Sequence, residues 1–203
     1  MIKDSLKQVS SRMMIMLFNQ LAVIVTIPLL AIQLSPLVFG LVSTSLIIIQ
    51  AGWVFIEWGL MNYSTEVWQD GASKIRQNRL ITNLINSRLI LSVIYLALIF
   101  CLIALGVIYI PYSFFLPLAL TTIFGALFPL WFFHVSKSSK ELVLITLGSR
   151  LIFIALVIIF IKTDAHALTY LYLHLISFMV VTLFAYYVMY EKFSFIWQGF
   201  NLI

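Results

Sequence analysis

Long stretches without charge, separated by short polar segments, dominate the sequence. No Asp, Glu, Lys or Arg lies between Arg12 and Glu57, or between Arg88 and Lys137. A helix crosses a bilayer core with about 20 apolar residues, so each stretch suits two spans joined by a tight turn. The stretches lack the two-residue alternation of outer-membrane strands, which favours helices. The pattern predicts six spans, at residues 13–34, 38–61, 89–110, 113–134, 142–161 and 168–190.

Composition supports a membrane protein. The chain is 63% hydrophobic and 9% charged, whereas an ordinary soluble domain is about 25% charged. We therefore expect an all-α, polytopic membrane helix bundle. The basic N-terminus is not followed by a small-residue cleavage site, so the sequence favours a retained first helix over a signal peptide. Cys101 is the only cysteine and lies in an apolar run; with no CxxC pair, no metal and no cofactor are expected.

The distribution of cations predicts the orientation in the membrane. Ten of the twelve Lys and Arg fall on one side of the six predicted spans: Lys3, Lys7, Arg12, Lys74, Arg76, Arg79, Arg88, Lys137, Lys140 and Lys192. Only Lys162 falls on the other side, and Arg150 lies within a span. By the positive-inside rule both termini are cytoplasmic. The net charge of +5 thus reflects topology, and no nucleic-acid partner is expected.

The connection 62–88 is long and polar, with apolar positions interleaved between its cations. Two interpretations stay open. The segment beyond Gly71 forms an amphipathic helix along the inner headgroups, where cations meet anionic lipid, or it is a cytosolic extension of the third span.

The stretch FPLWFFHVSKSSKE (128–141) ends the fourth span. Pro129 lacks an amide hydrogen and crowds the preceding turn, so we expect it to loosen the end of that helix. Trp131 and the two phenylalanines after it are expected at headgroup depth as an aromatic interface anchor.

Two ionisable residues stand in apolar surroundings. Arg150 lies nine residues beyond Glu141, about 13 Å into its span, where an arginine is costly and needs a partner or water. In one interpretation Arg150, with Arg88, contacts an anionic head group, since a guanidinium fork suits phosphate, and Glu57 tunes that site. In the other, Glu57 forms a structural ion pair with Arg150 or Arg88. His174 with Tyr170 either lines a polar pathway or is an ordinary core histidine.

Motifs for catalysis are missing from the sequence. It contains no HExxH, GxSxG or P-loop pattern, and its seven acidic residues lie mostly at the ends of the spans. A transporter is therefore expected rather than an enzyme.

Four blocks resemble the N-terminal part of Wzx-type flippases, in the polysaccharide-transporter branch of the MOP superfamily. They are Pro28 followed by SPLVFG (35–40), Glu57-Trp58-Gly59 with Ser64-Thr65, FPLWFF (128–133), and Arg150. FPLWFF is the most specific block. The sequence departs from the family at His134 to Lys137, where Gln-Gly and a Glu-Lys pair are usual, and at Glu66, where an arginine is common.

The resemblance implies flipping of an undecaprenyl-diphosphate-linked oligosaccharide across a bacterial inner membrane, for O-antigen or capsule assembly. It implies that residues 1–203 form a six-helix lobe, the N-terminal half of a two-lobe transporter. The implied partners are membrane lipids, a second lobe or a homodimer partner, and the polymerase and glycosyltransferases of the same process.

Two other functions remain open. A six-helix chain could be a homodimeric multidrug or ion exporter, or a non-transport subunit or membrane enzyme of polysaccharide assembly.

Overall fold

The protein is a bundle of helices. The computed structural model describes residues 24–67, 73–135 and 139–193, in which every regular element is a helix. In chain order the elements are the helix Ile24–Gln33, α2 (Pro36–Glu57), α3 (Leu60–Val67), α4 (Lys74–Ala104), α5 (Tyr112–Leu127), α6 (Leu130–Val135), α7 (Ser139–Phe160), the 3-10 turn η1 (Asp164–His166) and α8 (Ala167–Phe193).

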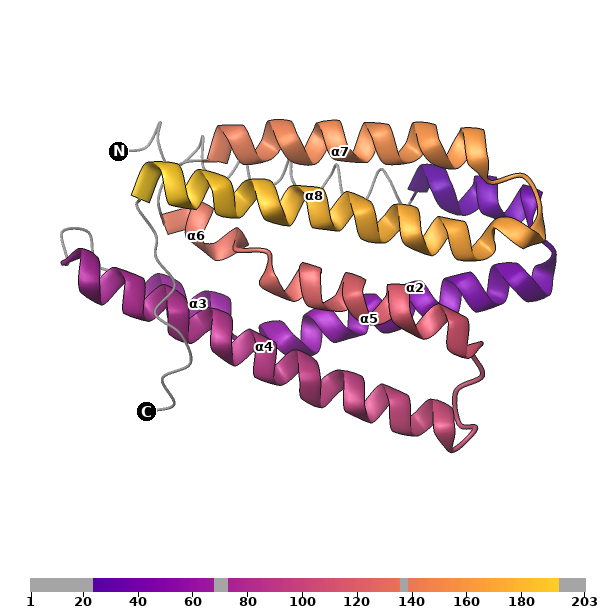
Figure 1. Ribbon diagram of the computed structural model, residues 1–203, viewed down its shortest axis with the longest axis horizontal. Helices are drawn as coiled ribbons and strands as arrows, with labels where there is room; N and C mark the ends of the chain where they lie inside the picture. Colours follow the sequence, from indigo (N-terminus) through magenta and orange to yellow (C-terminus); the bar gives the residue numbers. More distant parts are fainter. Residues whose placement is uncertain (1–23, 68–72, 136–138, 194–203) are drawn as a thin grey trace.

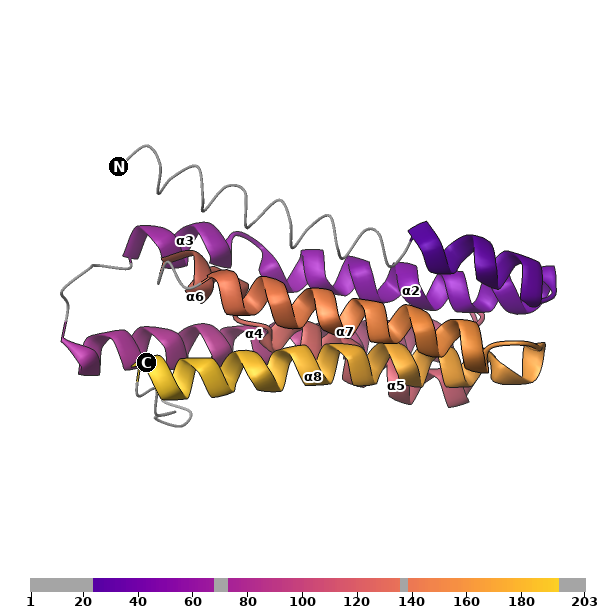
Figure 2. The ribbon, with the colours of Figure 1, turned by 90° about the horizontal axis from the view of Figure 1, so that it is seen from above.

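Five helical segments of the described chain are long and apolar enough to cross a membrane. They are Pro36–Ser64, Lys74–Ala104, Tyr112–Phe133, Val143–Phe160 and Asp164–Glu191. The long helices run roughly along one axis (Figures 1 and 2). This confirms the all-α polytopic bundle and the last five predicted spans. The first predicted span is described only from residue 24, as the short apolar helix Ile24–Gln33; its earlier part lies outside the described residues.

Helix α5 is the centre of the bundle, with α8, α2 and α4 packed around it, while α7 packs mainly on α8. The buried side chains form two clusters. One, around Leu118 and Val157, joins α2, α4, α5, α7 and α8. The other, around Trp131 and Phe132, joins α4, α6 and α8.

The outward faces of α4 and α7 are apolar. Val93 and Leu98 of α4 are exposed, as are Leu144 and Ile152 of α7. A water-soluble protein rarely exposes apolar faces of this extent, whereas in a bilayer they contact lipid tails.

Helix α4 is longer than the third predicted span, because it begins at Lys74 and continues unbroken to Ala104. Ser73 caps it, its side chain accepting a hydrogen bond from the Arg76 backbone N–H. The apolar stripe of this segment is buried against α6 and α8 at Ile81 and Leu84. The segment is thus an extension of the third span, and the structure does not support a separate helix lying along the headgroups.

A hydrogen bond joins two connections at the end of the bundle opposite Lys74, the one before α2 and the one between α7 and α8. The Ser35 backbone N–H, just before Pro36 starts α2, donates to Oδ1 of Asp164 in η1 at 2.7 Å. The first N–H groups of a helix have no partner within the helix, and a proline at the first position removes one of them without loss. The Asp164 carboxylate accepts from another, the N–H of Ser35, and its negative charge suits a helix start.

Close helix contact at Gly52 gives a stability prediction. A Cβ there would lie 2.7 Å from Cε1 of Tyr95 and 2.9 Å from Cγ2 of Thr122. We expect Gly52→Ala to lower the free energy of unfolding by about 1–3 kcal/mol through overpacking.

Gly148 in α7 is the matched control, because a Cβ there meets nothing within 4 Å. Gly148→Ala should be neutral or stabilising by up to about 1 kcal/mol through helix propensity. Denaturation of both variants in one detergent compares them, and equal effects would contradict the close contact.

Candidate functional site

Helix α2 breaks within the candidate membrane span Pro36–Ser64. Trp58 (φ 20°) and Gly59 (φ 80°) leave the helical conformation, and α3 starts at Leu60. Positive φ is strained for Trp58 and easily adopted by Gly59. Glu57, the last residue of α2, is placed directly before this break.

A second break separates α5 from α6 at Phe128 and Pro129, which confirms the predicted effect of Pro129 on the end of the fourth span. Proline supplies no backbone N–H, and the broken ladder exposes carbonyls that lipid cannot satisfy. Side chains of α4 and α8 donate to four of them: Thr182 Oγ1 to Phe124 O (3.0 Å), Arg88 Nη1 to Ala126 O (3.4 Å), Tyr186 Oη to Leu127 O (2.9 Å) and Arg88 Nη1 to Phe128 O (3.1 Å).

Arg88 links the two breaks. Its Nη2 donates to both carboxylate oxygens of Glu57, at 3.0 Å and 2.8 Å, while its Nη1 contacts the carbonyls at the end of α5. The Arg88 side chain is 4% exposed and that of Glu57 is 40% exposed. Among the sequence interpretations, the structure therefore shows the Arg88–Glu57 ion pair. Arg88 lies inside α4, not in a polar connection, because the helix begins much earlier than expected.

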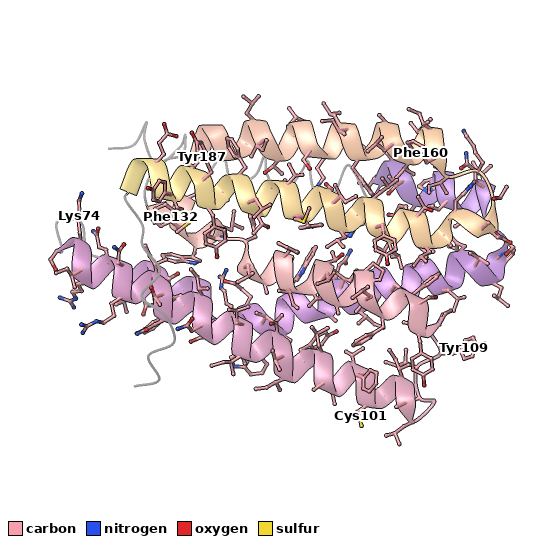
Figure 3. The ribbon with its side chains drawn as sticks, in the orientation of Figure 1. Lys74, Cys101, Tyr109, Phe132, Phe160 and Tyr187 are labelled. Atoms are coloured by element: carbon pink, nitrogen blue, oxygen red, sulfur yellow. The ribbon has the colours of Figure 1, made fainter. Side chains whose placement is uncertain are left out.

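The aromatic block after Pro129 is buried. Trp131, Phe132 and Phe133 are 1%, 0% and 2% exposed, and they pack with α4 and α8 side chains such as Ile81 and Val188. Figure 3 shows Phe132 inside the bundle beside α8. Trp131 is thus covered by the start of α4 and the end of α8 instead of facing outward, while its place at headgroup depth stays a prediction.

Arg150 forms a separate polar site between α7 and α8. Its Nη1 donates to Ser177 Oγ at 3.1 Å, and its guanidinium carbon lies 4.1 Å from the centre of the Phe178 ring. Ser149 also bonds Ser177, at 2.9 Å between hydroxyls. Arg150 is 5% exposed. Cation–π contact with the Phe178 ring is favourable when the cation is desolvated.

An aromatic column on α8 continues this polar site. His174 lies between Tyr170 and Phe178, with ring centroids 6.3 Å and 5.0 Å away. Trp53 of α2 packs on Phe178 at 4.5 Å. Within the described ranges His174 Nδ1 and Thr146 Oγ1 are buried without a hydrogen-bond partner, and such groups often mark places where water or ligand binds.

Glu57 and Arg150 therefore belong to different sites. Sequence reasoning located both arginines and Glu57, but it missed Ser177, Phe178 and Tyr186. The i, i+4, i+8 spacing of Tyr170, His174 and Phe178 on one helix face was the available signal for the column. No group of three or more His, Cys, Asp or Glu in the described chain could hold a metal ion.

Comparison with known proteins places the chain in a family. The family model described as "Polysaccharide biosynthesis protein" matches residues 5–203. The chain belongs to this family. The polysaccharide biosynthesis family includes the Wzx-type flippases, as the sequence blocks predicted. No curated protein and no solved structure matches the chain.

Membership in the polysaccharide biosynthesis family, together with five helices able to cross a membrane, shows a multi-pass membrane protein with a role in polysaccharide-related transport. Members of this family are typically transporters rather than enzymes.

Proposed function

We propose that the protein flips an undecaprenyl-diphosphate-linked oligosaccharide from the inner to the outer leaflet of a bacterial inner membrane, without acting as an enzyme. The family match over residues 5–203 is the observation that carries this proposal. Two buried arginines in membrane-spanning helices add support, since ionisable groups at such positions commonly belong to substrate pathways.

The two arginines have different roles in this proposal. Arg88 is held by Glu57 and by the end of α5, so it stabilises the junction of the broken helices. Arg150 donates to the Ser177 hydroxyl, and Ser149 beside it bonds the same hydroxyl, so neutral polar groups suited to an oxyanion line this site. We assign the diphosphate contact to Arg150, which becomes reachable when Trp53 of α2 moves away from Phe178.

The broken helices supply a mechanism for such movement. Helices α3 and α6 contact each other, and each follows a break. We therefore place hinges at Gly59 and Pro129, about which α2, with Trp53, and α5 move relative to the contacting helices α3 and α6. Discontinuous helices of this kind accompany alternating access in transporters.

Arg150 variants test the proposal in the source organism. We expect Arg150→Ala to reduce surface polysaccharide at least ten-fold at unchanged protein level, and Arg150→Lys to retain part of the export. Arg76→Ala on the exposed start of α4 is the matched control and should export normally. Wild-type export by Arg150→Ala would remove Arg150 from the mechanism, and normal export without the gene would refute the function.

Orientation is a separate proposal, with both termini and the start of α4 in the cytoplasm. Lys74 and Tyr109 lie at opposite ends of the bundle (Figure 3), and Tyr109 is 84% exposed. In a Cys101→Ser background, an impermeant maleimide should label Tyr109→Cys in cells whose outer barrier is opened, and Ser73→Cys only after lysis. The reverse pattern would contradict this orientation.

Pairing of this lobe with a second lobe, and cooperation with polymerase or glycosyltransferases, are further parts of the proposal. A stable homodimer that exports drugs or ions would instead favour the alternative exporter, and mass measurement in detergent distinguishes the two.

A further inference from the structure

The exposed face of α2 differs from the lipid-facing faces of α4 and α7. Its exposed positions include the polar residue Gln50, followed by Ala51 and Val54 and then Trp58 beyond the helix end. An amide placed in hydrocarbon without partners costs several kcal/mol. Gln50 is therefore suited to a polar partner on a face whose other exposed side chains, such as Ile47 and Val54, are apolar.

An open hollow of about 640 Å³ lies where α2 ends and α3 begins, lined by Val54, Glu57, Trp58 and Gly59. The hollow is shallow and wide open, so it suits one ring of a larger ligand rather than an enclosed small molecule. Gly59 carries no Cβ, and one built there would meet nothing within 4 Å, so the backbone leaves the hollow open at the break. The Trp58 ring is 78% exposed beside it.

The lining has two kinds of chemistry. The Glu57 carboxylate is held from behind by the buried Arg88 and is 40% exposed, so its orientation is fixed while a ligand can reach it. A carboxylate accepts hydrogen bonds from hydroxyls and repels phosphate. The indole of Trp58 offers a flat apolar face and one N–H donor.

We propose that this hollow binds a sugar ring of the transported oligosaccharide. The ring stacks on Trp58, and its hydroxyls donate hydrogen bonds to the Glu57 carboxylate; the inference rests on the proposed function. A pyranose has an apolar face, which suits the Trp58 ring, and a rim of hydroxyls, which suits the Glu57 carboxylate. Gln50 lies seven residues earlier on α2, about 10 Å along the helix, where its amide contacts the next sugar unit. Sugar recognition on α2 is thereby separated from diphosphate recognition at Arg150.

Saturation-transfer NMR tests this site with the full chain in lipid nanodiscs. The probe is the oligosaccharide released by mild acid from the surface polysaccharide of the source organism. We expect transfer to the probe with the wild type and with Trp58→Tyr, at least ten-fold weaker binding with Trp58→Leu, and a smaller loss with Gln50→Leu. Tyr190→Leu, which removes another exposed aromatic ring (66%), should bind as the wild type does.

Absence of transfer with the wild type, or equal transfer with Trp58→Leu, would overturn the sugar site. If Trp58 only anchors the helix to headgroups, Trp58→Leu will change membrane insertion and leave probe binding intact. Failure of the sugar site is distinguishable from failure of the proposed function, because lipid flipping by the wild type is measured without this probe.

Discussion

Replacing Arg88 by Leu should lower the free energy of unfolding by about 3–5 kcal/mol, the usual cost of breaking a buried ion pair. The substitution removes an ion-pair partner of the Glu57 carboxylate and the Arg88 donor to the carbonyls of Ala126 and Phe128. Those carbonyls lie at a helix break inside the membrane-spanning part, where lipid cannot replace the lost hydrogen bonds. Denaturation in detergent measures the effect.

A double-mutant cycle measures the interaction energy between Arg88 and Glu57. Glu57→Leu alone should cost about 1–3 kcal/mol, because the Glu57 side chain is 40% exposed, while the buried Arg88 loses its carboxylate partner and keeps only backbone carbonyls. The loss in free energy of unfolding of the double variant should be smaller than the sum of the two single-variant losses by at least about 0.5 kcal/mol, since contacting residues are coupled. Arg79→Leu on the exposed part of α4 is the control and should be near neutral. Strict additivity at residues 57 and 88 would contradict the ion pair.

Trp131→Ala should lower the free energy of unfolding by about 3–5 kcal/mol, because truncation of a fully buried aromatic side chain leaves a cavity. Trp131 is 1% exposed and packs in the cluster that joins α6 to α4 and α8. Thermal or denaturant unfolding in detergent measures this loss.

Trp58→Ala is the matched control, because the Trp58 side chain is 78% exposed and exposed substitutions usually change stability by less than about 0.5 kcal/mol. Similar small losses for both tryptophans would favour the interface anchor that the sequence suggested, and would contradict the burial of Trp131.

The contrast between Pro129 and Trp131 shows how far the sequence could predict this structure. The helix break at Pro129 follows from local covalent chemistry, so the sequence predicted it correctly. Burial of Trp131 depends on which helices pass over it. A Trp-Phe-Phe segment between an apolar span and lysines has the same local pattern whether it faces headgroups or packs against protein.

Arg88 illustrates the same limit for the functional residues. Its polar surroundings, with Asn86 and Thr82 nearby, indicated a connection, but α4 buries all three residues inside the bundle. The Arg88–Glu57 pair could be named as one of several pairings because few charges are available. The choice among those pairings required the long-range packing of α2 on α4, and the carbonyl contacts at the end of α5 required the exact helix break.

Arg150 was singled out from its depth in an otherwise uncharged span. Its partners Ser177 and Phe178 lie on another helix and are ordinary residues for a membrane span. Only the register of α7 against α8 brings them to the guanidinium.

Reconstitution tests the central claim, translocation of a lipid-linked oligosaccharide, most directly. Proteoliposomes carrying a fluorescent polyprenyl-diphospho-oligosaccharide are treated with an impermeant quencher that reaches only the outer leaflet. With the protein present, we expect nearly all of the fluorescence to be quenched on the timescale of transport, and only about half in protein-free liposomes or with Arg150→Ala. Quenching of only half in wild-type proteoliposomes, with folded protein present, would contradict the account.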